Sequence, residues 1–334
     1  MNLTDKQIAG QRLMVGFEGT RFSKDLMFLI DTIKIGGIVL FAQNVSTPEQ
    51  IKALTLSIQA YAASCGQPPL LIAIDQEGGE VARLKAPFSQ FPGNSLMKGE
   101  KDAEHFAVTT AAELTNVGIN MNFAPVMDVA LKNIQSIMAG RSFGNDPEWV
   151  ASLGVKVIKH LQNNNVMAVA KHFPGIGRTT ADSHIQMPFL NTKLSEMEVF
   201  DLLPFAAAID QDVAGIMLSH ILYKNIDPNW PASLSVLIAK NILRDRMRFK
   251  GLVITDDLDM GAVKKNYDIK TIIRQILSAE IDLILICHKG PDIEKAFNEI
   301  LQRCSDCTDT RKRGDESLKR ILGYKKKYIL KNKI

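Results

Sequence analysis

The chain has 334 residues, of which 46% are hydrophobic and 23% are charged, and its formal net charge is +4. This composition is that of an ordinary globular protein, and the small net charge argues against a nucleic-acid partner. No apolar stretch approaches the ~18 residues of a transmembrane helix, and the N-terminus lacks the basic and apolar regions of a signal peptide. We therefore expect a cytoplasmic protein with no membrane partner.

Both ends of the chain are expected to be helical. Thr4 and Gln7 have the spacing of a capping box, which predicts a helix near the N-terminus. The C-terminal tail, LKRILGYKKKYILKNKI, carries much of the positive charge and is interpreted as a solvated helix face. The four cysteines are too few for a disulfide framework, which fits a reducing compartment. The lone C-x-x-C of Cys304 and Cys307 lacks the second ligand pair that a zinc site needs.

Short apolar runs rich in β-branched residues recur along the chain, with helix-like segments between them, and this alternation predicts an α/β protein. Strands are expected at seven runs: Gly36 to Phe41, Leu70 to Ile74, Asn122 to Val129, Asn165 to Ala170, Val213 to His220, Gly251 to Thr255 and Asp282 to His288. Without a linker or a low-complexity segment, these runs favour one (β/α)8 TIM-like barrel domain over residues 1–334. A doubly wound sheet would give a similar pattern, but the chain has no G-x-G-x-x-G or Walker A sequence.

Polar residues or glycine follow nearly every apolar run. Because parallel strands present their carboxyl ends at one rim, these residues are expected to gather there. One such stretch is KHFPGIGRTTADSH, residues 171–184, where Pro174 and Gly175 are expected to end a strand and open a loop. Lys171 and His172 are therefore predicted at the mouth of the barrel.

A second dense stretch, GLVITDDLDMGA, runs from a buried strand directly into three aspartates. Asp256 comes first after the strand, so its side chain is expected to point into the mouth of the barrel. Asp257 and Asp259 are interpreted as N-cap or first-turn acids of the following helix. A carboxylate at Asp256 would suit a metal ligand, a general base or a nucleophile.

These polar side chains suggest either a metal site or a pair of groups for glycoside hydrolysis. A metal site of His172, His184, Asp182 and Asp256 lacks H-x-x-x-H spacing and paired carboxylate motifs, so no metal and no cofactor are expected. Glycoside hydrolysis needs an anionic nucleophile below the sugar and a proton donor beside the leaving oxygen. Asp256 and His184 would fill these roles, with Asp182 favouring the protonated imidazole. A loop-stabilising hydrogen bond is the alternative for this Asp-x-His pair.

Two further stretches contain groups suited to sugar hydroxyls. In AIDQEGGEVARL a strand ends at Asp75, two glycines permit a tight bend, and Arg83 follows. A carboxylate and a guanidinium together grip hydroxyls through directed hydrogen bonds. The stretch AGRSFGNDP contributes Arg141 in a loop. Each arginine taken alone also fits a surface ion pair.

Together these stretches resemble the family 3 glycoside hydrolases, and among them the single-domain β-N-acetylglucosaminidases. The resemblance covers nearly the whole chain, because ten motifs occur in the family's order: MVGFEG, GGIVLFAQN, IAIDQEGGEVARL, NFAPVMDV, GRSFGNDP, KHFPG, ADSH, IMLSHILY, PASLS and VITDDLDMGA. It implies a (β/α)8 barrel and retaining hydrolysis through a covalent glycosyl-enzyme.

By this resemblance, Asp256 matches the family's nucleophile, and His184 with Asp182 matches an acid/base dyad carried on a mobile loop. The residues that match those binding the terminal GlcNAc are Asp75, Arg83, Arg141, Lys171 and His172, while Met217 and His220 lie at the strand end that lines the same pocket. The chain departs from the family at Ile176, where the usual motif is GHG, and at Arg178, where a small or acidic residue is common. We expect these departures to alter loop packing and aglycone preference without loss of the chemistry.

The resemblance implies an exo-β-N-acetylglucosaminidase whose partner is a small carbohydrate. The expected substrates are muropeptide fragments such as GlcNAc-anhydro-MurNAc peptides, in cell-wall recycling. A hexosaminidase for chitooligosaccharides and a phosphorylase with the same pocket are alternatives. A sugar-binding pseudoenzyme would have lost Asp256 or His184, and both are present. We expect a monomer or a weak homo-oligomer.

Overall fold

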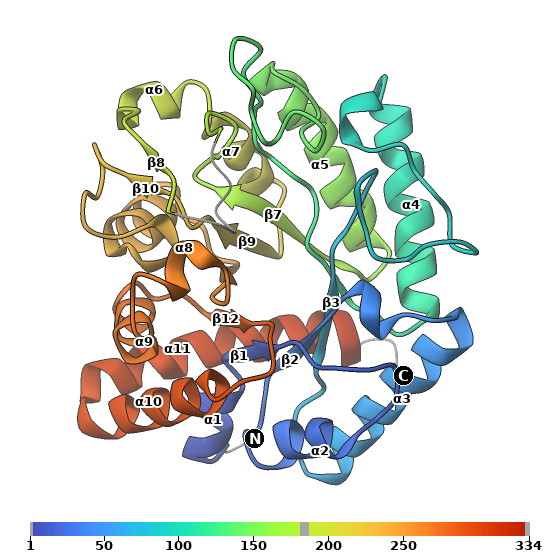
Figure 1. Ribbon diagram of the computed structural model, residues 1–334, viewed down its shortest axis with the longest axis vertical. Helices are drawn as coiled ribbons and strands as arrows, with labels where there is room; N and C mark the ends of the chain where they lie inside the picture. The colour runs from blue at the N-terminus through green and yellow to red at the C-terminus, as the bar shows by residue number, and fades with distance from the viewer. Residues whose placement is uncertain (1–2, 181–186, 331–334) are drawn as a thin grey trace.

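Eight parallel strands close into a barrel in the computed structural model, which describes residues 3–180 and 187–330 (Figure 1). The barrel strands are β1 (Leu13–Val15), β2 (Gly37–Leu40), β3 (Leu71–Ile74), β6 (Met121–Asn122), β7 (Met167–Phe173), β9 (Gly215–Leu218), β11 (Leu252–Asp257) and β12 (Leu283–Ile286). They follow one another around the barrel in chain order, and β1 pairs with both β2 and β12 to close it. The predicted (β/α)8 fold class is confirmed.

Helices surround the strands (Figure 1). The α-helices are α1 (Asp5–Gly10), α2 (Lys24–Asp31), α3 (Pro48–Ser64), α4 (Glu100–Asn116), α5 (Pro147–Asn163), α6 (Leu194–Glu198), α7 (Leu203–Asp210), α8 (Gly261–Lys264), α9 (Ile269–Ser278), α10 (Asp292–Asp306) and α11 (Thr308–Lys325). The predicted capping box is confirmed, because Thr4 Oγ1 accepts a hydrogen bond from the backbone N–H of Gln7, whose own side chain accepts one from Thr4 N–H. No helix of the described ranges is both long and apolar enough to cross a membrane.

Shorter elements fill the connections. Two small sheets pair β4 (Gln76–Gly78) with β5 (Val81–Ala82), and β8 (Phe189–Leu190) with β10 (Leu222–Tyr223). The 3-10 and π-helical segments are η1 (Ala42–Asn44), η2 (Asn94–Leu96), η3 (Ala232–Leu234), η4 (Leu237–Arg246) and η5 (Lys326–Leu330).

The barrel strands are apolar on both faces because both faces are covered. In β2, Ile38 and Leu40 belong to the cluster between strands and helices, whereas Val39 belongs to the cluster inside the barrel. Leu71 and Ala73 of β3 likewise point inward, into the same interior cluster as Val39. Side chains that alternate between two buried layers produce the continuous β-branched runs from which the strands were predicted.

Two strand predictions require correction. The eighth strand, Leu13–Val15, was missed because it has three residues and directly follows a segment with helix signals. The predicted strand Asn122–Val129 contributes the short β6 and then one isolated bridge, between Val126 and Lys171. Pro125 interrupts this segment and has no N–H with which to continue a ladder.

The predicted strand over Asn165 to Ala170 is longer at its end, because β7 continues to Phe173. Lys171 and His172 therefore lie within the strand rather than in the loop beyond it. Both side chains are buried, with exposed fractions of 2% and 6%. A strand holds them more rigidly than a loop would, which suits residues that must present fixed groups to a ligand.

The C-terminal tail is helical as predicted, but one of its faces is buried rather than solvated. Ile321, Lys325 and Tyr328 are at most 4% exposed. Their spacing of i, i+4 and i+7 puts them on one stripe of the helix. Ile321 and Tyr328 pack with the barrel interior, and Lys325 reaches residues that precede β1 and β2. Helix α11 and η5 therefore cover the end of the barrel at which the strands begin.

Candidate active site

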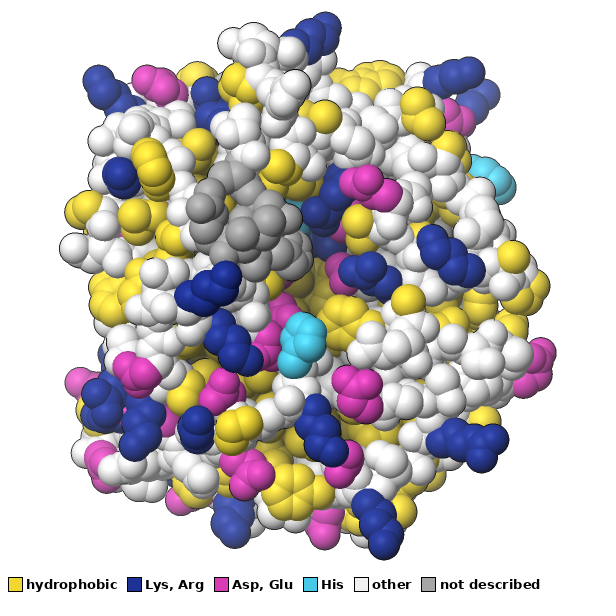
Figure 2. All heavy atoms as spheres, viewed as in Figure 1, with side chains coloured by type: hydrophobic (Ala, Val, Ile, Leu, Met, Phe, Trp, Pro, Cys, Tyr) yellow, Lys and Arg dark blue, Asp and Glu magenta, His cyan; other side chains and the backbone are white. Residues whose placement is uncertain are grey.

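A cavity of about 330 Å³ lies where the barrel strands end. Its volume is at the small end of the range for ligand pockets. Basic, acidic and histidine side chains gather around a hollow near the centre of the face seen in Figure 2. Seven of the ten predicted site residues line the cavity: Asp75, Arg83, Arg141, Lys171, His172, Met217 and Asp256. Barrel closure thus brings together side chains from five different barrel strands, β3, β6, β7, β9 and β11, and the segments that follow them.

Lys171 is the centre of a charged cluster on one side of the cavity. Its Nζ lies 2.6 Å from Asp75 Oδ1 and 2.6 Å from Glu77 Oε1. Arg83 Nη2 lies 3.3 Å from Asp75 Oδ2, and Arg141 Nη2 lies 2.7 Å from Glu77 Oε1. Charge-assisted hydrogen bonds of this kind are stronger than neutral ones and hold their partners in fixed geometry. The cluster therefore presents pre-oriented donors and acceptors to a polar ligand.

The charges in this cluster stabilise one another against burial. Burial alone would raise the pKa of Asp75, but Lys171 and Arg83 lower it to about 2. Burial would also raise the pKa of Glu77, yet Lys171 and Arg141 lower it. Burial disfavours the Lys171 ammonium, but Asp75 and Glu77 raise its pKa above the ordinary value. All three groups are therefore ionised at neutral pH.

Glu77 is a member of this cluster that the sequence analysis missed. It lies in β4, its side chain is 1% exposed, and its two oxygens accept hydrogen bonds from Arg141 Nε at 3.0 Å and Nη2 at 2.7 Å. A glutamate two residues after a strand-ending aspartate was the available signal, but its burial could not be read from the stretch itself. The predicted tight bend is present, because Gly78 and Gly79 both have positive φ, at 87° and 63°.

His172 is oriented by the fully buried Asp128. The ring Nδ1 lies 2.8 Å from Asp128 Oδ2, which also accepts the backbone N–H of His172 at 3.2 Å. Asp128 Oδ1 accepts the backbone N–H of Ile176 at 2.8 Å. Because Asp128 occupies Nδ1, Nε2 is the ring nitrogen left for a ligand.

Asp256 stands at the end of β11, half-buried in the cavity wall, and its Oδ1 accepts the backbone N–H of Asp257 at 2.8 Å. The interpretation of Asp257 and Asp259 as helix caps is wrong, since α8 begins after Met260 without a side-chain cap. Asp257 Oδ1 instead accepts N–H groups of Asp259 and Cys287, at 3.1 and 3.0 Å. Burial, together with the nearby charges of Asp259 and Asp256, raises the pKa of Asp257 to about 6.

Met217 and His220, predicted at one strand end, occupy different places. Met217 lies on β9 and lines the cavity. His220 follows the strand and stands behind the wall, 1% exposed. Its Nδ1 lies 2.6 Å from Ser233 Oγ, and its Nε2 lies 2.9 Å from the backbone carbonyl oxygen of Asp257. His220 therefore supports the backbone next to Asp256 rather than lining the cavity.

The predicted dyad of Asp182 and His184 falls on residues 181–186, which lie outside the described residues. The acid/base role of these two residues therefore stays a prediction.

Among the described residues, Asp257, Asp259 and His288 offer three ligand atoms within 4.8 Å of one another. Asp259 Oδ1, however, already pairs with Lys264 Nζ at 2.5 Å. The His288 side chain is 70% exposed. The expectation that the reaction needs no metal stays a prediction, to be checked by treating the enzyme with a chelator.

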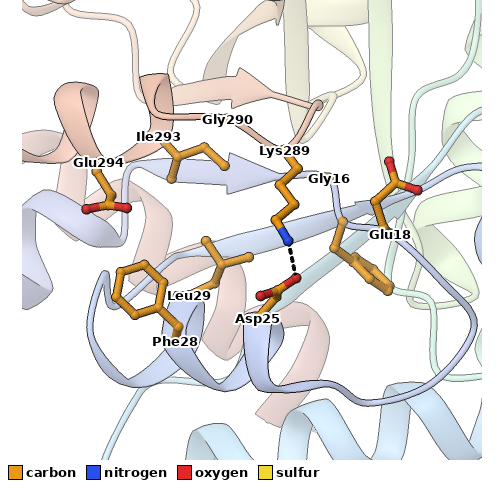
Figure 3. A pocket seen from close by; sticks show the side chains of 10 residues that line it. Gly16, Glu18, Asp25, Phe28, Leu29, Lys289, Gly290, Ile293 and Glu294 are labelled. Atoms are coloured by element: carbon orange, nitrogen blue, oxygen red, sulfur yellow. Dashed lines mark hydrogen bonds and ion pairs between the residues drawn. The ribbon is translucent and has the colours of Figure 1, made fainter.

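A second hollow, of about 190 Å³, lies at the same rim between α2 and the start of α10 (Figure 3). Leu29 and Ile293 form apolar wall, and Lys289 Nζ pairs with Asp25 Oδ2 at 2.6 Å beside them. Both ion-pair partners are more than half exposed, unlike the buried cluster around Lys171. An ion pair exposed to solvent contributes little binding free energy and does not fix its side chains in place. We therefore place the active site in the larger cavity.

A closed (β/α)8 barrel with an aspartate and a cluster of charged side chains around a cavity at its C-terminal rim is the arrangement of a barrel enzyme. The chain belongs to glycosyl hydrolase family 3, because the model of that family's N-terminal domain matches residues 3–323. The predicted family is thereby confirmed.

Individual relatives agree with this assignment. The chain is 34% identical over 307 residues to a β-hexosaminidase of Nitrosomonas eutropha, covering 89% of this chain and 86% of that protein. It is 36% identical over 269 residues to a β-hexosaminidase of Neisseria gonorrhoeae, covering 78% and 73%. The predicted enzyme class, a glycoside hydrolase of the β-N-acetylhexosaminidase type, is confirmed by the family and by these relatives named β-hexosaminidase.

Solved structures show the same similarity in three dimensions. A family 3 β-N-acetylglucosaminidase from Paenibacillus superposes with a TM-score of 0.94 at 35% identity, covering 99% of this chain. This chain spans 64% of the length of that protein. NagZ from Neisseria gonorrhoeae, in complex with N-trifluoroacetyl-D-glucosamine, superposes with a TM-score of 0.75 at 28% identity, covering 94% of this chain and 97% of that one.

Proposed function

We propose that this chain is a retaining exo-β-N-acetylglucosaminidase, which removes a terminal, non-reducing β-linked GlcNAc. The observation that carries the proposal is that Asp256 shares one small cavity with the charged groups of Asp75, Arg83 and Lys171 and with the His172 ring. Relatives named β-hexosaminidase, and a structural neighbour that binds an N-acylated glucosamine, support this choice of sugar.

The charged cluster would hold the sugar. Asp75, ionised because its pKa is about 2, accepts hydrogen bonds from hydroxyl groups. Arg83 and Lys171 donate to hydroxyl oxygens, and His172 adds the Nε2 position that its contact with Asp128 leaves available. Because these groups already bind one another, little ordering is needed when the sugar enters.

In the first chemical step, Asp256 would attack the anomeric carbon of the GlcNAc. The bond to the aglycone oxygen breaks while His184 donates a proton to that oxygen, and a glycosyl ester forms on Asp256. The nearby Asp182 would stabilise the imidazolium form of His184 before this transfer.

In the second step, the imidazole of His184 would take a proton from water. The resulting hydroxide equivalent attacks the anomeric carbon and breaks the ester, which releases GlcNAc in its original β configuration and frees the Asp256 carboxylate. Two inversions at one carbon therefore give net retention.

We also propose GlcNAc-anhydro-MurNAc peptides as the natural substrates, in cytoplasmic peptidoglycan recycling. The support is the resemblance to the single-domain branch of the family. Chitooligosaccharides are the alternative substrates. The purified chain is expected to give a higher kcat/KM on the muropeptide fragment than on the GlcNAc disaccharide, and the reverse ranking would favour the alternative.

The test of the reaction itself uses aryl β-GlcNAc and aryl β-glucoside, with the first-formed product followed by NMR. We expect cleavage of the GlcNAc substrate, release of β-GlcNAc before mutarotation, and a rate independent of phosphate. An α-configured first product would contradict the retaining mechanism. GlcNAc 1-phosphate formed in phosphate buffer would indicate a phosphorylase, and failure to cleave aryl β-GlcNAc would contradict the proposed function altogether.

A further inference from the structure

The segment that follows β7 is anchored where this chain departs from its family, at Ile176 and Arg178. Arg178 Nε lies 3.0 Å from Asp201 Oδ1 and 2.8 Å from Asp201 Oδ2. The Arg178 guanidinium carbon also stands 5.1 Å from the centroid of the Phe200 ring. Asp201 and Phe200 precede α7, so this ion pair joins the segment after β7 to the next helical layer of the barrel.

The backbone around Arg178 fits closely against its neighbours. Gly175 has a φ of 121°, and a Cβ there would stand 2.9 Å from the Cβ of Asp201. A Cβ at Gly177 would stand 1.9 Å from the carbonyl oxygen of Val129. The carbonyl oxygen of Gly175 accepts a hydrogen bond from Tyr223 Oη at 2.9 Å. Residues 175–178 are therefore held in one position against three neighbouring segments.

The ion pair is important because the Asp201 carboxylate is almost fully shielded from solvent. Its side chain is 1% exposed, whereas Arg178 is 22% exposed. Burial raises the pKa of Asp201 to about 6, and the nearby Asp128 acts in the same direction, whereas Arg178 lowers it. Without Arg178, the Asp201 carboxylate would be buried without this cation. Such burial is unfavourable, so the present arrangement of residues around Asp201 would be destabilised.

We propose that Arg178 is a positioning residue, and that its contact with Asp201 sets the reach of the segment carrying the acid/base group. This inference rests on the proposed role of His184, six residues beyond Arg178 in the chain. A chain spans at most ~3.6 Å per residue. With Arg178 held by Asp201, His184 can therefore lie at most about 22 Å from Arg178, the length of six extended residues.

The test compares leaving groups in Arg178→Ala. We expect kcat on a GlcNAc disaccharide to fall about 10- to 100-fold, because small displacements of a catalytic group have losses of this size. The nitrophenolate group of an aryl substrate leaves without needing a proton. The rate of the first step on this substrate should therefore change less than about threefold. KM on the disaccharide should stay within about twofold, since the groups around Lys171 are untouched.

Two rescues separate positioning from general damage to the fold. Guanidinium chloride at millimolar concentration should restore part of the lost disaccharide activity in Arg178→Ala, because it can re-occupy the place beside Asp201. Arg178→Lys keeps the charge and should show a smaller, parallel loss. If Arg178→Ala is too unstable to assay, the same leaving-group comparison on Arg178→Lys decides the matter.

Arg274→Ala is the matched control. Arg274 Nε contacts the buried Glu299 Oε1 at 2.9 Å, on α9 and α10, and its loss should leave the leaving-group dependence unchanged. Equal losses on both substrates in Arg178→Ala, or no loss at all, would overturn the proposed positioning role of Arg178. In that event a normal leaving-group effect in His184→Ala would show that the proposed function still stands. If His184→Ala itself shows no dependence on the leaving group, both the proposed function and the positioning role of Arg178 are overturned.

Discussion

Two buried lysines lie at opposite ends of the barrel and have opposite surroundings. Lys171 of β7 faces the active-site cavity, and its Nζ lies 2.6 Å from each of two carboxylates, Asp75 and Glu77. Lys325 of α11 closes the other end, where its Nζ donates to Gln11 Oε1 at 2.6 Å and to the carbonyl oxygen of Gly36 at 2.7 Å.

The two lysines are nearly equally buried, with exposed fractions of 2% and 1%, so burial does not distinguish them. Their partners do. Carboxylates raise the pKa of Lys171 despite burial, whereas burial lowers the pKa of Lys325 to about 7. A buried lysine stays charged where acids surround it, and such charge at a strand end indicates ligand binding. A lysine satisfied by neutral oxygens serves packing instead.

The largest effect is expected from a substitution at the active-site end of the barrel, and this substitution should leave the stability of the fold nearly unchanged. Asp256→Asn should lower turnover by ~10⁴-fold or more, because an amide cannot form the glycosyl ester and the transition state loses its counter-charge. The thermal midpoint should change little, since Asp256 is half-buried and belongs to no ion pair among the described contacts. Steady-state rates and thermal melts check both statements. Labelling of a different residue by a fluorosugar trap would reassign the nucleophile.

The next effect tests the other half of the reaction. His184→Ala should lower the rate on natural disaccharides by ~10²–10⁴-fold, because their alcohol leaving groups need a proton. A nitrophenyl substrate should lose less in its first step and then show a burst, as the glycosyl-enzyme on Asp256 accumulates. Azide, which needs no general base, should restore turnover and yield β-glycosyl azide. Equal losses on both substrates without azide rescue would move the acid elsewhere, with His172 the first to examine.

Matched substitutions of the two lysines test the comparison directly. Lys171→Met should destabilise the fold by about 3–5 kcal/mol, because it removes the central cation from two buried carboxylates. Lys325→Met should be close to neutral, since the neutral acceptors it leaves are less costly than uncompensated charges. Chemical denaturation at pH 7 measures both. Equal destabilisation by the two substitutions would contradict the idea that their partners, rather than their burial, set them apart.

The smallest effect is a pH dependence of stability that arises from Lys325, at the end of the barrel where the strands begin. The pKa of Lys325 is about 7 in the folded chain, against an ordinary value of 10.5, so the unfolded chain binds more protons between these limits. The free energy of unfolding should therefore rise with pH in this window, by at most ~1.4 kcal/mol per unit. Below pH 7 the lysine is protonated in both states and its contribution is flat. The difference between wild type and Lys325→Met isolates this slope, and identical slopes would contradict it.

Local patterns sufficed to predict much of the site. Asp75, Lys171, His172 and Asp256 each stand at the end of an apolar run, and a barrel brings such ends to one rim. The same patterns misjudged residues whose role depends on a distant neighbour. Asp257 was taken for a helix cap, although it holds the backbone of Cys287. Lys325 was assigned to a solvated face, although its stripe is buried.

The sequence by itself determined the fold class, the family and the residue types at the rim, because these depend on alternating apolar runs and on short motifs in order. Tertiary structure alone decided which charges meet. Lys171 finds Asp75 across 96 residues, and Lys325 finds Gly36 across 289. These contacts exist once the barrel has closed, and the resulting electrostatic field, rather than any local pattern, decides which buried lysine remains charged.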